Sequence, residues 1–112
     1  GEPRVSERVA GAAEVLLSAV TLGELYYGAA KSARAQQNIA RLDQFAAGRA
    51  ILACDAATAR EYGDIKAKLR ERGRPLPDND IWVAALARSH DLALVTRDAH
   101  FREVEALTVE VW

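Results

Sequence analysis

The chain has 112 residues, of which half are apolar and 28% are charged, a composition typical of one soluble globular domain. Its formal net charge of −1 excludes a broad electrostatic attraction to nucleic acid or anionic membranes, so any such binding must use a local patch. The single cysteine, Cys54, excludes a thiolate metal site and fits a cytoplasmic, reducing environment. We expect it to be a small buried side chain. No apolar stretch approaches the ~20 residues that a membrane span requires.

The first half of the chain alternates between helix-like and strand-like patterns. In order, we expect a helix at residues 3–13, a strand at 14–19, helices at 21–30 and 33–48, and a strand at 50–54. In the third of these helices Ile39, Leu42 and Ala46 recur at helical spacing, and Gly48 is a natural helix end.

The second half continues this alternation. We expect a helix at residues 56–73 capped by Asp55, a helix at 78–90, a strand at 92–96, a helical turn at 98–104 and a closing strand at 107–112. The strands read as continuous apolar runs, a pattern typical of parallel strands covered on both faces. The sequence therefore predicts a single α/β domain with a mostly parallel central sheet between helices.

Three acidic residues fall where this fold would bring them together. Glu24 follows the strand at 14–19, Asp98 follows the strand at 92–96, and Asp80 opens the helix that leads back into that second strand. In open α/β sheets, functional groups collect at the carboxyl ends of the strands. We therefore expect the three carboxylates to converge at one edge of the sheet.

Each acid also has a structural interpretation. Thr21 and Glu24 fit a capping box, Asp78 and Asp80 complement a helix dipole, and Asp98 can cap the turn that follows it. Three carboxylates held close together, however, repel one another unless a cation neutralises them. An all-oxygen site suits Mg²⁺ or Mn²⁺, and such an ion can activate water against a phosphodiester bond.

Three blocks resemble the PIN-domain ribonucleases, and within them the VapC toxin branch of toxin–antitoxin pairs. The blocks are "SAVTLGELYYGA" at residues 18–29, "PLPDNDIWVAALA" at 75–87 and "LALVTRDAHF" at 92–101. The resemblance covers nearly the whole chain, and the order and spacing of the blocks make it specific.

The resemblance implies a metal-dependent endoribonuclease with a three-layer α/β/α fold. It places the metal-binding acids on Glu24, Asp80 and Asp98, with Thr96 as a hydroxyl that helps to position ligands or water. Asp78 and Asn79 are auxiliary candidates, and helix capping remains an alternative role for Asp78. The implied partners are an RNA substrate, a cognate antitoxin that lies along the groove near the acids, and a second copy of the chain in a homodimer.

The chain departs from the family at its start. Family members begin with a strand that ends in an aspartate, whereas no Asp precedes Asp43 here. The resemblance therefore implies a PIN domain without its first, central strand, shorter than the family's layout by roughly 15–20 residues; the crossover that a parallel strand requires sets the minimum. Its site would keep three acids rather than four, so this chain alone is expected to bind metal weakly and to be weakly active or inactive.

A basic run precedes the helix that carries Asp80. Residues 66–74 hold five cations and one acid, so 5 − 1 gives a local charge of +4. This run is a candidate track for the RNA backbone, and the alternative is a solvated helix face. The five cations are Lys66, Lys68, Arg70, Arg72 and Arg74.

The aromatic and histidine side chains have simpler expectations. One of Tyr26 and Tyr27 is expected in the core, with the other free to stack on a base or a partner. Trp82 is expected to pack against the sheet. His100 is expected at the surface, because the sequence shows no partner that would make it a base.

Two other functions remain open. The main alternative, which the absence of one acid makes plausible, is a PIN-like binding module that engages an antitoxin or RNA without cleaving it. A receiver-type phosphoryl-transfer domain also has an acid pocket, but it needs an acid pair on a second strand, and no such pair is evident.

Overall fold

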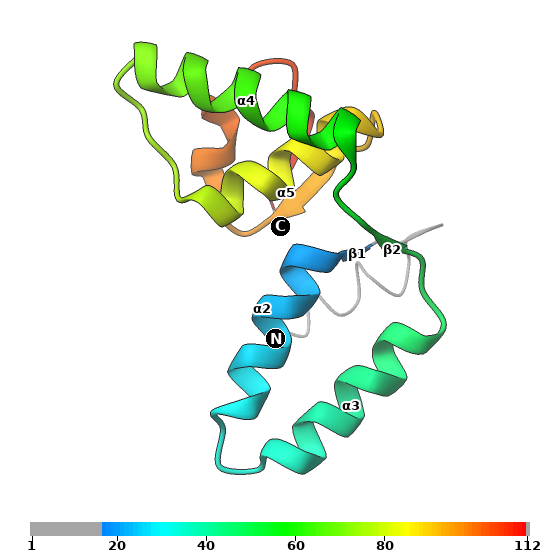
Figure 1. Ribbon diagram of the computed structural model, residues 1–112. Coiled ribbons are helices and arrows are strands. Elements are labelled where there is room, and N and C mark those ends of the chain that lie inside the picture. The colour runs from blue at the N-terminus through cyan, green and yellow to red at the C-terminus, as the bar shows by residue number, and fades with distance from the viewer. Residues whose placement is uncertain (1–16, 112) are drawn as a thin grey trace. The chain divides into compact units, whose positions relative to one another are not determined.

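The computed structural model describes residues 17–111, so the helix expected at 3–13 and the first part of the strand expected at 14–19 lie outside the described residues. The chain forms two compact units, Gly1–Leu52 and Ala53–Trp112 (Figure 1). None of the described helices is long and apolar enough to cross a membrane.

The first unit is a pair of helices joined to a short parallel strand pair. Its elements are β1 (Leu17–Ser18), α2 (Ala19–Ala30), α3 (Ala35–Ala47) and β2 (Ile51–Leu52). Leu17 pairs with Ile51 in a parallel register, which confirms the expected strand direction. The helices α2 and α3 pack against each other, and the Tyr26 hydroxyl donates a 2.5 Å hydrogen bond to Asp43 across them. This bond raises the pKa of Tyr26.

The start of α2 differs from the expected capping box. The helix begins at Ala19, and the hydroxyl of Ser18 accepts a 2.9 Å hydrogen bond from the backbone N–H of Thr21. Thr21 therefore lies inside the helix, and the capping role predicted for Thr21 and Glu24 is wrong. Ser18 supplies the cap because it precedes the first helical residue, where a hydroxyl reaches the free N–H groups.

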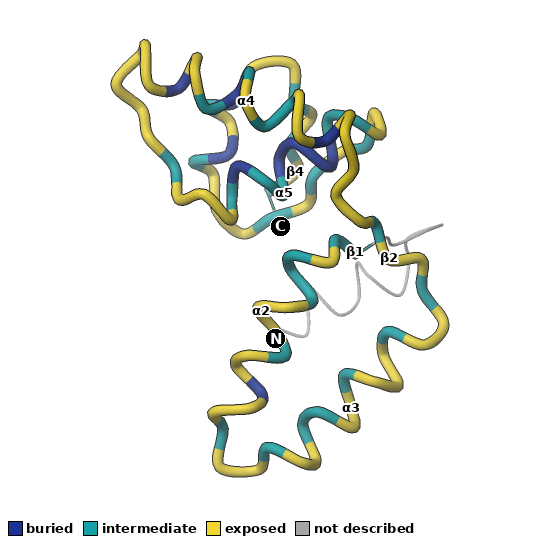
Figure 2. The backbone as a smooth tube through the Cα atoms, viewed as in Figure 1, coloured by how far each residue is buried: buried dark blue, intermediate teal, exposed yellow. Residues whose placement is uncertain are grey.

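The first unit buries little of its described surface. Ala29 is its one buried residue between positions 17 and 52, and the predicted inward stripe of α3 is only half-buried (Figure 2). Tyr26 is half-buried, whereas the side chain of Tyr27 is 67% exposed. Neither tyrosine is fully buried, so the expectation that one of them enters the core is wrong.

The second unit contains the main hydrophobic core. Its elements are α4 (Ala56–Glu71), α5 (Asp78–Ser89), β3 (Leu94–Thr96), the short 3-10 helix η1 (Ala99–Glu103) and β4 (Val109–Val111). The strands β3 and β4 pair in parallel, with Leu94 opposite Val109. As predicted, Asp55 caps α4 by accepting a 3.0 Å hydrogen bond from the N–H of Thr58. Asp55 also accepts a 3.0 Å hydrogen bond from the hydroxyl of Thr58, and the backbone and hydroxyl bonds together lower the pKa of Asp55.

The core forms where α4, α5 and η1 meet. The alanines of α5 at this contact have no exposed surface, so the two helices approach each other closely. The buried core residues are Ile65, Leu69, Ile81, Ala84, Ala85, Phe101 and Val104.

An arginine network adds a polar link between α4 and α5. The side chain of Arg88 is 12% exposed and bridges Glu61 at 2.5 Å and Asp64 at 2.6 Å, both on α4. It also donates a 2.9 Å hydrogen bond to the carbonyl of Glu105. Each of the three guanidinium nitrogens of this nearly buried side chain therefore donates a hydrogen bond.

Two packing expectations are wrong. Cys54 is exposed, because β2 ends at Leu52 and position 54 lies in the connection to α4. Trp82 is only half-buried, and its ring stacks on Tyr62 of α4 with a centroid distance of 4.0 Å.

Candidate functional site

Asp80 and Asp98 lie on either side of one imidazole ring, that of His100. Nδ1 of His100 is 2.7 Å from Oδ1 of Asp98, and Nε2 is 3.4 Å from Oδ2 of Asp80. The structure thus brings two of the three predicted acids to a common point within the second unit. The histidine expected at the surface without a partner is half-buried and contacts both carboxylates, so that expectation is wrong.

Local structure explains why these groups meet. The hydroxyl of Thr96, at the end of β3, accepts a 3.1 Å hydrogen bond from the N–H of Asp98 and so shapes the turn. Asp98 then caps η1 through the N–H of His100, as the sequence predicts for a cap. The buried side chain of Phe101 anchors η1 in the core, while buried Ile81 anchors the first turn of α5 beside Asp80.

Glu24 lies in the first unit, exposed in the second turn of α2. Its convergence with the other two acids stays a prediction. Within residues 17–111, no three His, Cys, Asp or Glu side chains are arranged to hold a metal ion among themselves. The carboxylate oxygens of Asp80 and Asp98 are, by their chemistry, the kind of ligand that Mg²⁺ or Mn²⁺ prefers.

Asp78 has a structural role that the sequence did not reveal. The residue before α5 is Pro77, which provides no side-chain cap, and Asp78 accepts hydrogen bonds at 3.0 Å from both Lys66 and Tyr62. The bond from Lys66, followed by that from Tyr62, holds the pKa of Asp78 below its usual value. Asp78 therefore ties the start of α5 to α4 and lies inside the helix, so the alternative capping role is wrong; the auxiliary role at the site stays a prediction. Asn79 beside it is exposed.

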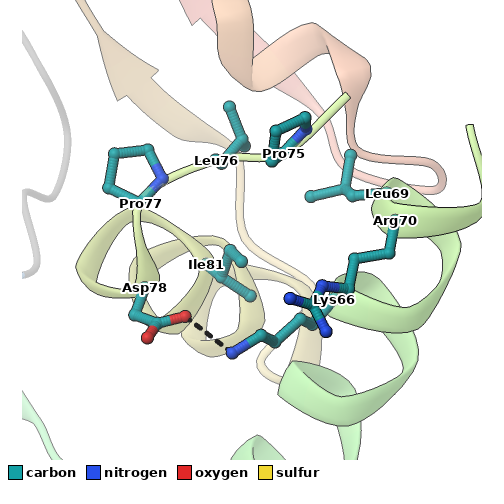
Figure 3. A pocket seen from close by; sticks show the side chains of 8 residues that line it. All are labelled: Lys66, Leu69, Arg70, Pro75, Leu76, Pro77, Asp78 and Ile81. Carbon is teal, nitrogen blue, oxygen red and sulfur yellow. Dashed lines mark hydrogen bonds and ion pairs between the residues drawn. The ribbon is translucent and has the colours of Figure 1, made fainter. Parts of the chain in front are cut away.

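A pocket of about 350 Å³ lies between the C-terminal half of α4 and the start of α5 (Figure 3). The ammonium of Lys66 points across it to Asp78, and Arg70 extends along its rim. Its lining residues are Lys66, Leu69, Arg70, Pro75, Leu76, Pro77, Asp78 and Ile81.

The basic run divides into paired and unpaired cations. Lys66 pairs with Asp78 at 3.0 Å and Lys68 with Asp64 at 3.3 Å. Arg72 lies 3.9 Å from Glu105 and also donates to a backbone carbonyl. Arg70 and Arg74 form no ion pair with any residue from 17 to 111. Two of the five cations are therefore without an ion pair among the described residues, and one of them, Arg70, lines the pocket and helps to lower the pKa of Asp78 by its charge.

Comparison with known proteins gives consistent results. A family model described as "PIN domain" matches residues 2–107. The chain is 40% identical over 102 residues to "Ribonuclease VapC2" of Haemophilus influenzae, which covers 90% of this chain and 77% of the relative. It is 39% identical over 100 residues to "tRNA(fMet)-specific endonuclease VapC" of Shigella flexneri, covering 88% and 76% of the two chains.

Solved structures match as well. DNA-bound VapBC from Salmonella typhimurium superposes with a TM-score of 0.90 at 30% identity, covering 99% of this chain and 86% of that chain. VapBC2 from Rickettsia felis, bound to a DNA fragment from its promoter, gives a TM-score of 0.86 at 29% identity over 97% and 83% of the two chains. These matches confirm the predicted α/β fold class.

Proposed function

Because this chain belongs to the PIN-domain family and to its VapC ribonuclease branch, we propose that it is an endoribonuclease toxin that hydrolyses RNA phosphodiester bonds with Mg²⁺ or Mn²⁺. The observation that carries the proposal is the approach of Asp80 and Asp98 to one imidazole at the end of β3. A pair of acids in this position matches the acids that the family resemblance assigns to the metal.

Each site residue has a proposed role. Asp80, Asp98 and Glu24 hold the cation, and Thr96 fixes the turn that presents Asp98. A bound divalent cation would lower the pKa of a water molecule and stabilise charge on the phosphoryl oxygens. The chain's own contribution is to place carboxylates of fixed orientation around that position, which lowers the reorganisation that the reaction requires.

The RNA backbone is proposed to follow the basic run toward Asp80. Arg70 and Arg74 are the strongest candidates for phosphate contacts, because Lys66, Lys68 and Arg72 already have acidic partners. A cation that must first leave an ion pair contributes less to binding a phosphate.

The proposed partners are a cognate antitoxin and a second copy of the chain, in the cytoplasm. The antitoxin is supported by the matches to VapBC structures from Rickettsia felis, Salmonella typhimurium and Haemophilus influenzae. Its proposed effect is inhibition, with its C-terminal segment lying along the groove near the acids.

The proposal is tested with Asp80→Asn and a matched control, Asp91→Asn, which removes one carboxylate outside the site. We expect the unchanged protein to cleave RNA only with Mg²⁺ or Mn²⁺. Asp80→Asn is expected to lower the rate about 100-fold or more, because a lost ligand removes several kcal/mol of transition-state stabilisation. The measurements are cleavage of a fluorogenic RNA and calorimetric titration with Mn²⁺.

Three results would each contradict a part of this proposal. Cleavage that persists in EDTA would contradict metal dependence, and equal rates for Asp80→Asn and Asp91→Asn would remove Asp80 from the site. RNA or antitoxin binding by a protein that never cleaves RNA would favour the binding module instead.

A further inference from the structure

The pocket between α4 and α5 has an apolar inner wall and a charged rim. The lining side chains of Leu69 and Ile81 are almost fully buried, since both belong to the core. Residues 75–77, with the sequence Pro–Leu–Pro, run along one side of the pocket, and the charged side chains lie on the other (Figure 3). A wall built on the core and on two prolines has few conformations to lose, so the pocket is largely formed before a ligand binds.

The charged rim offers a hydrogen-bond donor and an acceptor side by side. Nζ of Lys66 donates to the hydroxyl of Tyr62 at 3.1 Å and to Oδ1 of Asp78 at 3.0 Å. An ammonium group has three N–H donors, so one of them remains for a ligand. Asp78 accepts the bonds from Lys66 and Tyr62 through Oδ1, which leaves the lone pairs of Oδ2, and its side chain is 63% exposed. The bond to Asp78, followed by that to Tyr62, raises the pKa of Lys66, so this donor keeps its charge.

The rim also carries a surplus of positive charge. Lys66 and Arg70 are cations and Asp78 is an acid, so 2 − 1 gives a local charge of +1. Arg70 has no ion pair within residues 17–111, so it can contact an anion without leaving a carboxylate first. A guanidinium matches the geometry of phosphate oxygens. The pocket therefore complements a ligand that combines an apolar face, a polar edge and an anionic group.

The size and position of the pocket suit a single nucleotide. Its volume of about 350 Å³ lies near the lower end of the roughly 300–1,000 Å³ that small-ligand sites occupy. Asp78 opens α5, and Asp80, a proposed metal ligand, lies two positions later, a rise of about 3 Å along the helix axis. A nucleotide in the pocket would therefore lie in the first helical turn that also carries Asp80.

We propose that the pocket binds one unstacked base of the RNA substrate, close to the bond that is cleaved. The base packs on the apolar wall, the Lys66–Asp78 pair forms hydrogen bonds with its polar edge, and Arg70 contacts its phosphate. This inference rests on the proposed function and makes the pocket the source of any preference for one base over another. In single-stranded RNA the base edges are free for such contacts, and base contacts carry the sequence information that phosphate contacts lack.

The Lys66–Asp78 pair also ties α4 to α5, so a loss of activity alone would not reveal a contact with the base. Base preference separates the two roles. A pair that only supports the helices would affect the cleavage of all sequences alike, whereas a pair that contacts the base would affect them unequally.

The test is therefore the base preference of cleavage. A pool of RNA with random sequence is cut with Mn²⁺, and sequencing of the product ends gives the frequency of each base at every position around the cut. For the unchanged protein we expect one position near the cut to prefer one base by about tenfold. Asp78→Asn should reduce or reassign the preference at that position alone, because the amide replaces an acceptor at the pocket edge by a donor.

Two further variants serve as comparisons. Arg70→Gln should lower the rate by about three- to tenfold with the base preference unchanged, because it removes only a phosphate contact. Asp91→Asn, outside the site, should match the unchanged protein in rate and preference. The same base preference in Asp78→Asn as in the unchanged protein would overturn the inference, even if the rate fell.

A second measurement needs neither cleavage nor a substitution. The unchanged protein is titrated with the four nucleoside 5′-monophosphates, and the methyl NMR signals of Leu69, Leu76 and Ile81 are followed. We expect saturable shifts that differ among the four bases, whereas inorganic phosphate should leave these methyl signals in place. Equal shifts with phosphate, or none with any nucleotide, would overturn the proposal. Shifts with an acidic, leucine-containing peptide but with no nucleotide would assign the pocket to a protein partner instead.

The outcomes separate this inference from the proposed function. Metal-dependent cleavage without any base preference would refute the role of the pocket and leave the nuclease proposal standing. If the unchanged protein cleaved no RNA with Mg²⁺ or Mn²⁺, the proposed function would fail, and the nucleotide titration would still decide whether the pocket binds a base.

Discussion

Lys68 and Arg70 lie two positions apart on α4 and carry the same charge, but they differ in their partners. Lys68 is 3.3 Å from Asp64, whereas Arg70 has no ion pair within the described residues and borders the pocket. The net charge of the basic run at residues 66–74 does not distinguish these two cations. Their partners make Arg70 the better candidate for RNA.

We expect Arg70→Gln to weaken RNA binding more than Lys68→Gln does. Losing a phosphate contact should lower affinity by about three- to tenfold and reduce the dependence of log K on log salt by about 0.7 for a single strand. The measurement is fluorescence anisotropy of a labelled RNA in an Asp80→Asn background over a salt series. Equal losses from the two variants would assign the whole run to a solvated helix face.

The proximity of Asp80 and Asp98 could be predicted from the sequence, because Asp80 lies at the start of a helix and Asp98 directly after a strand. It did not predict the contact of His100 with both acids, because that contact depends on the turn at Thr96 and on the anchoring of Phe101. The convergence of Glu24 with these acids is still a prediction.

At the scale of elements, the packing of α4 on α5 combines an apolar contact with the Arg88 network. Arg88 reaches Glu61, Asp64 and a carbonyl beyond η1, so one side chain links both helices to the segment before β4. Its partners are partly exposed, so solvent weakens each ion pair. The hydrogen bonds remain important because the arginine itself is nearly buried.

Replacement of Arg88 by methionine should destabilise the protein by about 1–3 kcal/mol, because it removes the hydrogen bonds that the nearly buried guanidinium donates to Glu61, Asp64 and the carbonyl of Glu105. The control is Arg60→Met on the exposed face of α4, which should change stability by less than about 0.5 kcal/mol. Urea denaturation followed by circular dichroism measures both. Similar midpoints for the two variants would show that the network contributes no stability.

The helices were predictable to within a few residues because their apolar spacing and end signals agree, as at Asp55 and Gly48. The strands are shorter than predicted: β2 covers Ile51–Leu52 where five residues were expected. An apolar run shows which residues favour a strand, but the ladder extends only as far as a partner pairs with it.

At the scale of the whole molecule, burial among residues 17–111 is concentrated in the second unit. Between positions 17 and 52 one residue is buried, while α4, α5 and η1 share a continuous core. The sequence predicts a single domain, and cooperative unfolding of both units would support that prediction.

Hydrogen exchange should reveal this difference in burial. We expect amides in α4 and α5 to exchange about tenfold more slowly than those in α2 and α3, because local opening of the first unit exposes little apolar surface. Exchange followed by mass spectrometry on peptides from each helix provides the measurement. Uniform protection across all four helices would indicate one cooperative unit instead.

The stacked rings of Tyr62 and Trp82 give the second unit an optical signature. One ring belongs to α4 and the other to α5, two positions after Asp80, and their planes are inclined by only 15°. Their electronic transitions are therefore coupled while the helices stay packed. The near-ultraviolet circular dichroism of these two rings should therefore report, without an added dye, whether α4 and α5, the two most buried of the described helices, remain packed together.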